Sequence, residues 1–275
     1  MFLQCGKFKL SLERPLIMGV VNVTPDSFSD GGQFSDPRQA AAHARRLIDE
    51  GAGIIDIGGE STRPGAAPVG LEEERRRVLP VLEALAGCGA PLSVDTRQPG
   101  LMREAIAAGA DMVNDVTALS APGALEAVAR ADCAVCLMHM QGDPRTMQHH
   151  PAYQDVVREV RDYLAGRVAA AVAAGIARDR IVVDPGFGFG KTVDHNLALL
   201  RSLGKFRQLG IGLMAGLSRK AMLGKITGRE VGDRVHASVA AALAAVENGA
   251  QIVRVHDVAA TRDALAVWQA VKQQN

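Results

Sequence analysis

The sequence predicts one closed (β/α)8 barrel over residues 1–275, with its site at the C-terminal ends of the strands. Three observations predict this fold. Short apolar runs alternate with helix-like segments, and eight such units follow one another. The runs are continuously apolar, as in parallel strands that helices cover. No Pro/Gly/Ser-rich linker divides the chain, so a single domain is expected.

The predicted strands are the apolar runs that end on, or close to, a polar residue. They are residues 16–22, 54–58, 91–95, 111–115, 134–139, 181–184, 212–217 and 251–256.

The helices are predicted from their start and stop signals. Asp36 and Pro37 form an N-cap and a first-turn proline, and the helix they begin continues to Glu50, where Gly51 ends it. The same ending, a glycine between a helix and a buried strand, recurs at Gly109, Gly175 and Gly249. Two strand-to-helix connections, residues 23–37 and 58–71, are long and glycine-rich, and we expect them to carry function or to close over the site.

Composition excludes several functional classes. The net charge of +1 and the 4% aromatic content argue against an extended nucleic-acid or membrane-binding face. No run of 18 apolar residues and no signal peptide is present, so we expect a cytoplasmic protein without a membrane span. Cys133 and Cys136 lack the partners of a zinc site and are predicted to be buried small hydrophobes.

Polar side chains at strand tips are expected to converge on one site. Asp95, Asn114 and Asp184 each end a strand, and a lone buried carboxylate there is costly unless it meets a donor. Either nearby cations satisfy these groups as structural ion pairs, or a planar heterocycle with an N–H-rich edge does.

Positive charge is expected at the same rim. The residues that supply it are Arg63, Lys220, Arg254 and His256. Arginine suits a bidentate phosphate contact. The amide of Asn22 could supply one oxygen to Mg²⁺, which takes few protein ligands and keeps water and substrate phosphate as the others.

The segment from Asp184 to Lys191 resembles a phosphate-binding loop but fails the pattern, because Pro185 stands where the first glycine is required. Its glycines still allow backbone to approach a ligand closely. Phe189 is predicted to line a pocket. No nucleophile–base pair is evident, so group transfer with loss of a phosphate or diphosphate is favoured over acyl transfer.

Taken together, these motifs closely resemble those of the dihydropteroate synthase family. The segments that carry the resemblance are residues 18–32, 56–65, 93–96, 114–115, 137–142, 184–191, 218–220 and 254–258, which span nearly the whole chain.

The resemblance implies condensation of (7,8-dihydropterin-6-yl)methyl diphosphate with 4-aminobenzoate to give 7,8-dihydropteroate and diphosphate. It also implies Mg²⁺ bound by Asn22, a homodimer and sulfonamide inhibition. By motif, the pterin-binding residues are Asp95, Asn114, Asp184 and Lys220, and those of the diphosphate region are Thr62, Arg63, Arg254 and His256. The aminobenzoate pocket is expected to include Phe28, Pro64, Phe189, Ser218 and Lys220.

The resemblance and the residues together suggest a dissociative, SN1-like path. Asp95, Lys220 and Arg254 are the residues expected to act in catalysis, with Asp95 stabilising a cationic pterin. His139 has no assigned role. The helices at residues 235–247 and around Trp268 are the expected dimer surface.

Two other functions share parts of this pattern. A methyltransferase acting on methyltetrahydrofolate and a corrinoid protein would share the Asp/Asn set but would not need the diphosphate residues. A non-catalytic pterin-binding paralogue should have lost a loop or metal residue, whereas Asn22, Asp26, Thr62 and Arg63 are all present.

Overall fold

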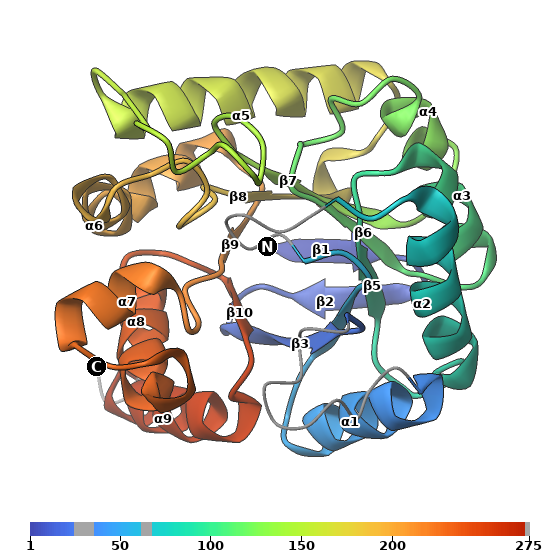
Figure 1. The fold of residues 1–275 in the computed structure, drawn as a ribbon, viewed down its shortest axis with the longest axis horizontal. Helices are drawn as coiled ribbons and strands as arrows, with labels where there is room; N and C mark the ends of the chain where they lie inside the picture. The colour runs from blue at the N-terminus through green and yellow to red at the C-terminus, as the bar shows by residue number, and fades with distance from the viewer. Residues whose placement is uncertain (25–35, 62–67, 273–275) are drawn as a thin grey trace.

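The computed structural model describes residues 1–24, 36–61 and 68–272, and its core is a closed barrel of eight parallel strands (Figure 1). The strands are β3 (Leu16–Asn22), β4 (Ile54–Gly58), β5 (Leu92–Asp95), β6 (Met112–Asp115), β7 (Ala134–Met138), β8 (Ile181–Asp184), β9 (Gly212–Ala215) and β10 (Ile252–Val255). They pair in chain order, and β10 closes the barrel against β3. The predicted (β/α)8 barrel is therefore confirmed, with strand ends that differ by two residues at most.

Helices surround this barrel (Figure 1). They are α1 (Pro37–Asp49), α2 (Leu71–Ala84), α3 (Pro99–Ala107), α4 (Ala124–Ala129), α5 (Val156–Ala173), α6 (Val193–Arg201), α7 (Ala221–Thr227), α8 (Val235–Glu247) and α9 (Val258–Lys272). Short 3-10 turns occupy Arg178–Arg180, Leu203–Leu209 and Val231–Asp233. None of the helices in the described part of the chain has the length and apolar character needed to cross a bilayer.

The predicted helix signals are confirmed in the structure. Asp36 caps α1 by accepting a hydrogen bond from the backbone N–H of Arg38 at 2.9 Å. The predicted stop glycines all have positive φ, from 99° to 110°, a backbone conformation that residues with a Cβ rarely adopt. These are Gly51, Gly109, Gly175 and Gly249.

An N-terminal hairpin, not among the predicted elements, closes the bottom of the barrel. Strands β1 (Phe2–Cys5) and β2 (Phe8–Ser11) pair antiparallel and are seen through the centre of the barrel in Figure 1. The buried side chains Leu3 and Cys5 pack with the inward-facing Met18, Ile54 and Ile252. The hairpin therefore seals the end of the barrel opposite the strand tips and leaves those tips as the open end.

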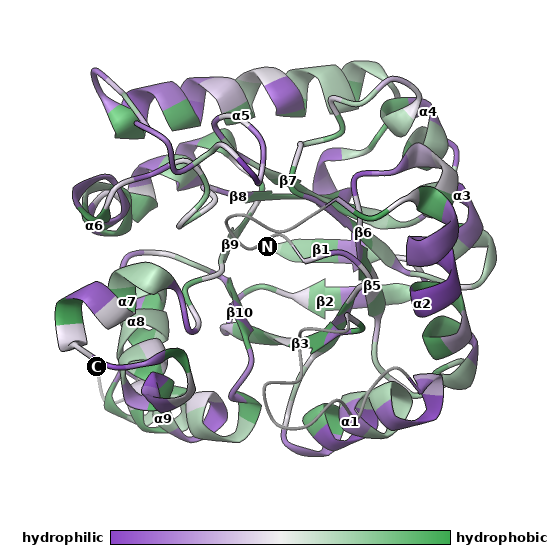
Figure 2. Ribbon diagram, in the orientation of Figure 1, coloured by the Kyte–Doolittle hydropathy of each residue, from purple (hydrophilic) through white to green (hydrophobic). Residues whose placement is uncertain are grey.

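Side-chain direction separates the helix-facing and inward-facing positions of each strand. Figure 2 shows that hydrophobic residues make up most of the barrel strands. Outward residues such as Ile55, Ile57 and Val94 are buried among the apolar residues of the surrounding helices. The bottom of the barrel interior is apolar, whereas the upper inward positions are polar. This change from apolar to polar places the site at the tips of the strands.

Both residues of the C-x-x-C pair are buried thiols. Cys133 is 2% exposed and Cys136 is fully buried, and each belongs to an apolar cluster. Burial raises the pKa of both thiols, so they stay protonated. The prediction that they act as small hydrophobes is confirmed.

Candidate active site

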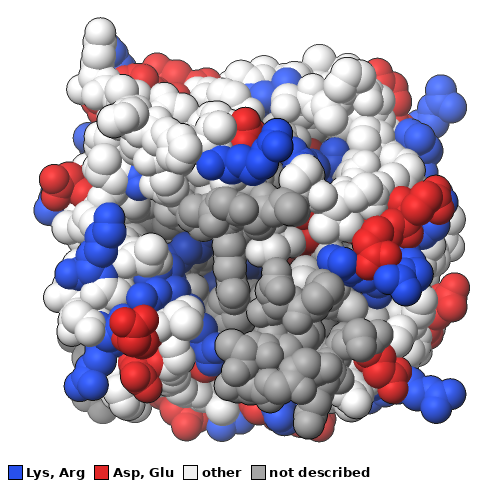
Figure 3. Space-filling view, in the orientation of Figure 1, with Lys and Arg blue, Asp and Glu red and all other residues white. Residues whose placement is uncertain are grey.

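The strand tips enclose a cavity at the open end of the barrel. The residues that line it are Asp95, Asn114, Val116, Met138, Asp184, Phe187, Phe189, Gly216, Lys220 and Arg254. Six of these were predicted site residues, and they come from strands β5, β6, β8 and β10 and from the loops after β8 and β9. On the face seen in Figure 3, Lys and Arg side chains are interspersed with Asp and Glu.

Arg254 joins Asp95, which lines this cavity, to Asp56, which does not. Its Nε donates to Oδ2 of Asp56 at 2.6 Å, and its Nη2 donates to Oδ2 of Asp95 at 2.9 Å. Burial lowers the pKa of the Arg254 guanidinium, but the two carboxylates outweigh burial and raise that pKa overall. Arg254 is therefore positively charged, and its hydrogen bonds to Asp56 and Asp95 fix its position.

Asp95 and Lys220 have pKa values displaced toward neutrality. Burial raises the pKa of Asp95 to about 7, although Arg254 acts in the opposite direction. Burial lowers the pKa of Lys220 to about 8, although Asp184 favours its charged form. Lys220 Nζ lies 4.0 Å from the centre of the Phe189 ring, a cation–π contact that fixes both side chains on one wall.

The loop after β8 folds back on the barrel around a buried lysine. Lys191, 3% exposed, donates to the backbone carbonyls of His139, Gly186 and Phe189 at 2.9–3.3 Å. A Cβ on Gly186 would lie 1.9 Å from the carbonyl oxygen of His139, so only glycine fits there. Lys191 therefore stabilises the loop through hydrogen bonds to its backbone. In a phosphate-binding loop, by contrast, the lysine side chain points at the ligand.

His139 contacts Lys191 of this loop and does not line the cavity. Its Nδ1 lies 3.0 Å from Lys191 Nζ. Burial and Lys191 together lower the pKa of His139 to about 3, so its ring is neutral near pH 7. Met138, and not His139, lines the cavity.

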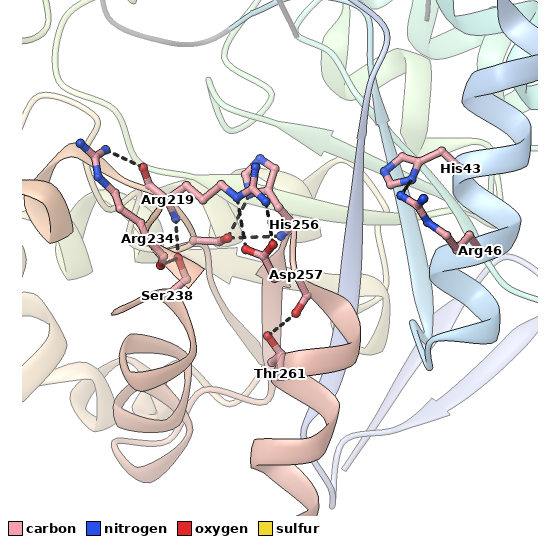
Figure 4. Close-up of polar contacts among 9 residues, drawn as sticks. His43, Arg46, Arg219, Arg234, Ser238, His256, Asp257 and Thr261 are labelled. Carbon is pink, nitrogen blue, oxygen red and sulfur yellow. Dashed lines mark hydrogen bonds and ion pairs between the residues drawn. The ribbon is translucent and has the colours of Figure 1, made fainter. Parts of the chain in front are cut away.

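Ser218 and His256 contact each other, and neither lines the cavity. Figure 4 shows His256 beside Arg219 and Asp257. The Ser218 Oγ accepts a hydrogen bond from the backbone N–H of His256 at 3.2 Å and lies 3.0 Å from its Nδ1. The adjacent Arg219, at φ 57°, is held by Asp257, with its Nη2 2.6 Å from Oδ1. These contacts between the β9 and β10 tips fix the backbone that leads into Lys220.

Asn22 lies at the mouth of the barrel next to Asp95. A Cβ placed on Gly58 would lie 3.8 Å from Asn22 Oδ1 and 3.5 Å from the Cβ of Asp95, so the two side chains flank this glycine. Among the described residues, no three His, Cys, Asp or Glu side chains gather as a metal site. The predicted residues Phe28, Thr62, Arg63 and Pro64, together with Asp26, lie outside the described residues.

Asp56, which was not among the predicted site residues, contacts two cavity residues. Asp56 is fully buried in the middle of β4 and receives hydrogen bonds from Arg254 and from Asn114. A signal was present, because an aspartate between isoleucines in an otherwise apolar strand is costly unless it is paired.

A parallel barrel with an acidic, lysine-containing cavity at its strand tips has the architecture of a barrel enzyme. The profile of the family described as "Pterin binding enzyme" matches residues 18–256. The chain belongs to this family of pterin-binding enzymes.

Similar proteins show which class of pterin-binding enzyme the chain belongs to. It is 57% identical to the dihydropteroate synthase of Neisseria meningitidis serogroup B, over 98% of this chain and 96% of that protein. The Yersinia pestis dihydropteroate synthase in a sulfonamide drug complex superposes with a TM-score of 0.96 at 47% identity, over 99% of this chain and 100% of that chain. The Burkholderia cenocepacia enzyme complexed with 7,8-dihydropteroate gives 0.91 at 53% identity, over 99% and 97%. Within the pterin-binding enzymes, the chain is a member of the dihydropteroate synthases.

Proposed function

We propose that this chain condenses (7,8-dihydropterin-6-yl)methyl diphosphate with 4-aminobenzoate. In this reaction the bond between the methylene carbon and the diphosphate oxygen breaks. A carbon–nitrogen bond forms to the amine of 4-aminobenzoate, which loses a proton. The observation that carries the proposal is the convergence of Asp95, Asn114, Asp184 and Lys220 on one cavity, in a chain whose relatives are dihydropteroate synthases.

Recognition of the pterin is proposed to rest on three acceptors and one donor. Asp95, Asn114 and Asp184 present oxygen atoms that suit the N–H groups of the heterocycle, and Lys220 supplies a donor for a ring oxygen or nitrogen. Each charge-assisted hydrogen bond of this kind is worth about 1.5–3 kcal/mol. One oxygen of Asp184 also accepts the backbone N–H of Gly186 at 2.7 Å, which fixes this carboxylate in the wall.

The chemical step is proposed to be dissociative. As the diphosphate departs, positive charge develops on the pterin, and the ionised Asp95, whose side chain is only 11% exposed, stabilises it. Arg254 favours the ionised form of Asp95 and orients its carboxylate. Thr62, Arg63, Arg254 and His256 are proposed to meet the leaving diphosphate, and Phe28, Pro64, Phe189, Ser218 and Lys220 to form the aminobenzoate pocket.

The pH dependence of kcat/KM for the pterin substrate follows from two of these groups. Asp95 is ionised above its pKa of about 7, and Lys220 is charged below its pKa of about 8. We therefore expect a narrow bell-shaped profile, falling about tenfold per pH unit on the acid side and again on the alkaline side. Steady-state rates across this pH range measure the profile. Asp95→Asn should remove the acid limb, and an unchanged acid limb in that variant would assign it to another group.

Mg²⁺ is proposed to bind at Asn22, the last residue of β3, whose amide oxygen lies beside Gly58. Asn22 offers a neutral oxygen, and the described part of the chain holds no group of three His, Cys, Asp or Glu side chains; such a site fits an ion that keeps water and substrate phosphate as its other ligands. When bound, the ion would neutralise charge on the departing diphosphate. Asn22 itself would fix where the diphosphate lies relative to Asp95.

Asn22→Ala is expected to raise the Mg²⁺ concentration needed for half-maximal activity by about tenfold, because one protein ligand is lost. Titration of activity against Mg²⁺ in both proteins measures the shift. Pterin affinity, measured without Mg²⁺, is the control and should not change. Superimposable Mg²⁺ titrations would refute the assignment.

A cytoplasmic homodimer is also proposed. The four cysteines are all free thiols, which fits a reducing compartment. Val267 and Val271 of α9 are each 67% exposed, and the neighbouring α8 consists mainly of alanine and valine. A dimer that buries these helices would cover this apolar area. Light scattering of the purified protein tests this state.

The test of the proposed function is diphosphate release with both substrates and Mg²⁺. We expect release to require 4-aminobenzoate and to match dihydropteroate formation. Methyl transfer from methyltetrahydrofolate to a corrinoid, without diphosphate release, would identify the methyltransferase. Pterin binding without either reaction would identify a non-catalytic binding protein.

A further inference from the structure

Asp56 occupies a position directly beneath the cavity without lining it. The residue is fully buried in β4 and pairs in register with Ser93 of β5, one inward position below Asp95. A single oxygen, Oδ2, accepts from Arg254 Nε at 2.6 Å and from Asn114 Nδ2 at 3.0 Å. Both donors line the cavity, so the hydrogen bonds of Asp56 reach a ligand through these two side chains.

The contact with Asp56 determines which end of the Asn114 amide faces the ligand. A carboxylate oxygen paired to a guanidinium can only accept, so Asn114 must turn its NH₂ group toward Asp56. The amide is planar, with its oxygen on the other branch of the terminal carbon, so that oxygen is the group left to face the cavity. If the Asp56 acceptor were absent, either end of the amide could face the ligand.

We propose that Asp56 is a positioning residue that selects for N–H-rich ligands by holding Asn114 with its oxygen toward the cavity. The proposal rests on the proposed function and deepens it. With Asn114 held this way, Asp95, Asn114 and Asp184 each present an oxygen acceptor to the cavity. A heterocycle edge that carries donors fits these acceptors, whereas an edge with an acceptor in the same place meets a lone pair and loses affinity.

The structure also supplies a matched control. Ser93 lies beside Asp56 in the barrel register and is fully buried, and its Oγ has no hydrogen-bond partner among the described residues. Ser93→Ala therefore changes the same layer of the barrel interior without touching the contact to Asn114. If looser packing beneath the cavity is enough to weaken ligand binding, Ser93→Ala should weaken it too.

The experiment measures the ratio of the affinities for two ligands. A general loosening of the fold would weaken the binding of both ligands and leave this ratio unchanged. Calorimetry compares the affinity for 2-amino-4-oxopteridine with that for 2,4-dioxopteridine, in which a carbonyl acceptor replaces the donor amine and ring N1 gains a hydrogen. We expect the wild-type protein and Ser93→Ala to prefer the amino compound by at least about tenfold. Two acceptor-free variants, Asp56→Val and Asp56→Ala, should weaken its binding by about ten- to hundredfold and bring the ratio of the two affinities close to one.

Asp56→Asn provides the conservative comparison. The introduced amide oxygen can still accept from Arg254 and Asn114, so we expect its selectivity to be largely retained while affinity falls. Equal weakening of both compounds in Asp56→Val and Asp56→Ala, with the ratio unchanged, would overturn the proposal and leave Asp56 a structural residue. A wild-type protein that binds neither pteridine would instead contradict the proposed function itself.

Discussion

Asp95→Asn is expected to lower the single-turnover rate of dihydropteroate formation by about 10²–10³-fold while pterin affinity changes far less. The ionised carboxylate stabilises the transition state more than the ground state, because positive charge develops on the pterin as the diphosphate departs. An isosteric amide carries no charge to stabilise it. The hydrogen bond from Arg254 Nη2 can still be accepted by the amide oxygen, so the fold of the site should persist. Rapid-quench kinetics at saturating substrate measures the chemical step, and calorimetry measures pterin affinity.

Two outcomes are informative for this variant. A normal single-turnover rate would rule out the role of Asp95 in the chemical step. A loss of pterin affinity as large as the loss of rate would show that Asp95 binds the ground state and the transition state equally. Only a rate loss well in excess of the affinity loss supports charge stabilisation during departure of the diphosphate.

Arg254→Leu is expected to destabilise the protein by about 3–5 kcal/mol as well as to abolish activity. The change leaves Asp56 and Asp95 buried without the cation that pairs with both. Without Arg254 the pKa of Asp95 rises above about 7, so the variant should recover part of its stability as the pH falls through this raised pKa toward the ordinary pKa of an unfolded aspartate, because the folded variant then binds a proton that the unfolded chain does not. Urea unfolding at several pH values measures the free energy of unfolding.

Arg254→Lys is the matched comparison for this change. Lysine retains the positive charge but cannot reach two carboxylates as a planar fork, so we expect a smaller loss of stability and a large loss of activity. An Arg254→Leu variant within about 1 kcal/mol of the wild type at pH 8 would contradict the view that Arg254 neutralises buried ionised carboxylates.

The parts of the site that the sequence predicted are those in which a polar residue ends an apolar run. Asp95, Asn114 and Asp184 follow this pattern, and the barrel brings their side chains to one cavity. The parallel arrangement makes this outcome predictable, because the C-terminal ends of all eight strands must meet at one end of a closed barrel.

The contacts that support the site could not be predicted in the same way. Arg254 and Asp56 are 198 residues apart in sequence, and their pairing depends on barrel closure and on side-chain length. Lys191 looks like a phosphate ligand from its glycine-rich surroundings, but the fold of the loop turns its ammonium toward three backbone carbonyls. The N-terminal hairpin has strands of four residues each, too short for a periodicity signal.

The most direct test of the central claim is a crystal structure of the protein with 2-amino-4-oxopteridine bound. We predict that the heterocycle lies in the cavity at the strand tips, with N–H groups within hydrogen-bond distance of Asp95, Asn114 and Asp184 and with Lys220 beside its ring. A pteridine bound elsewhere, or one in the cavity that leaves these three acceptors unpaired, would contradict the account.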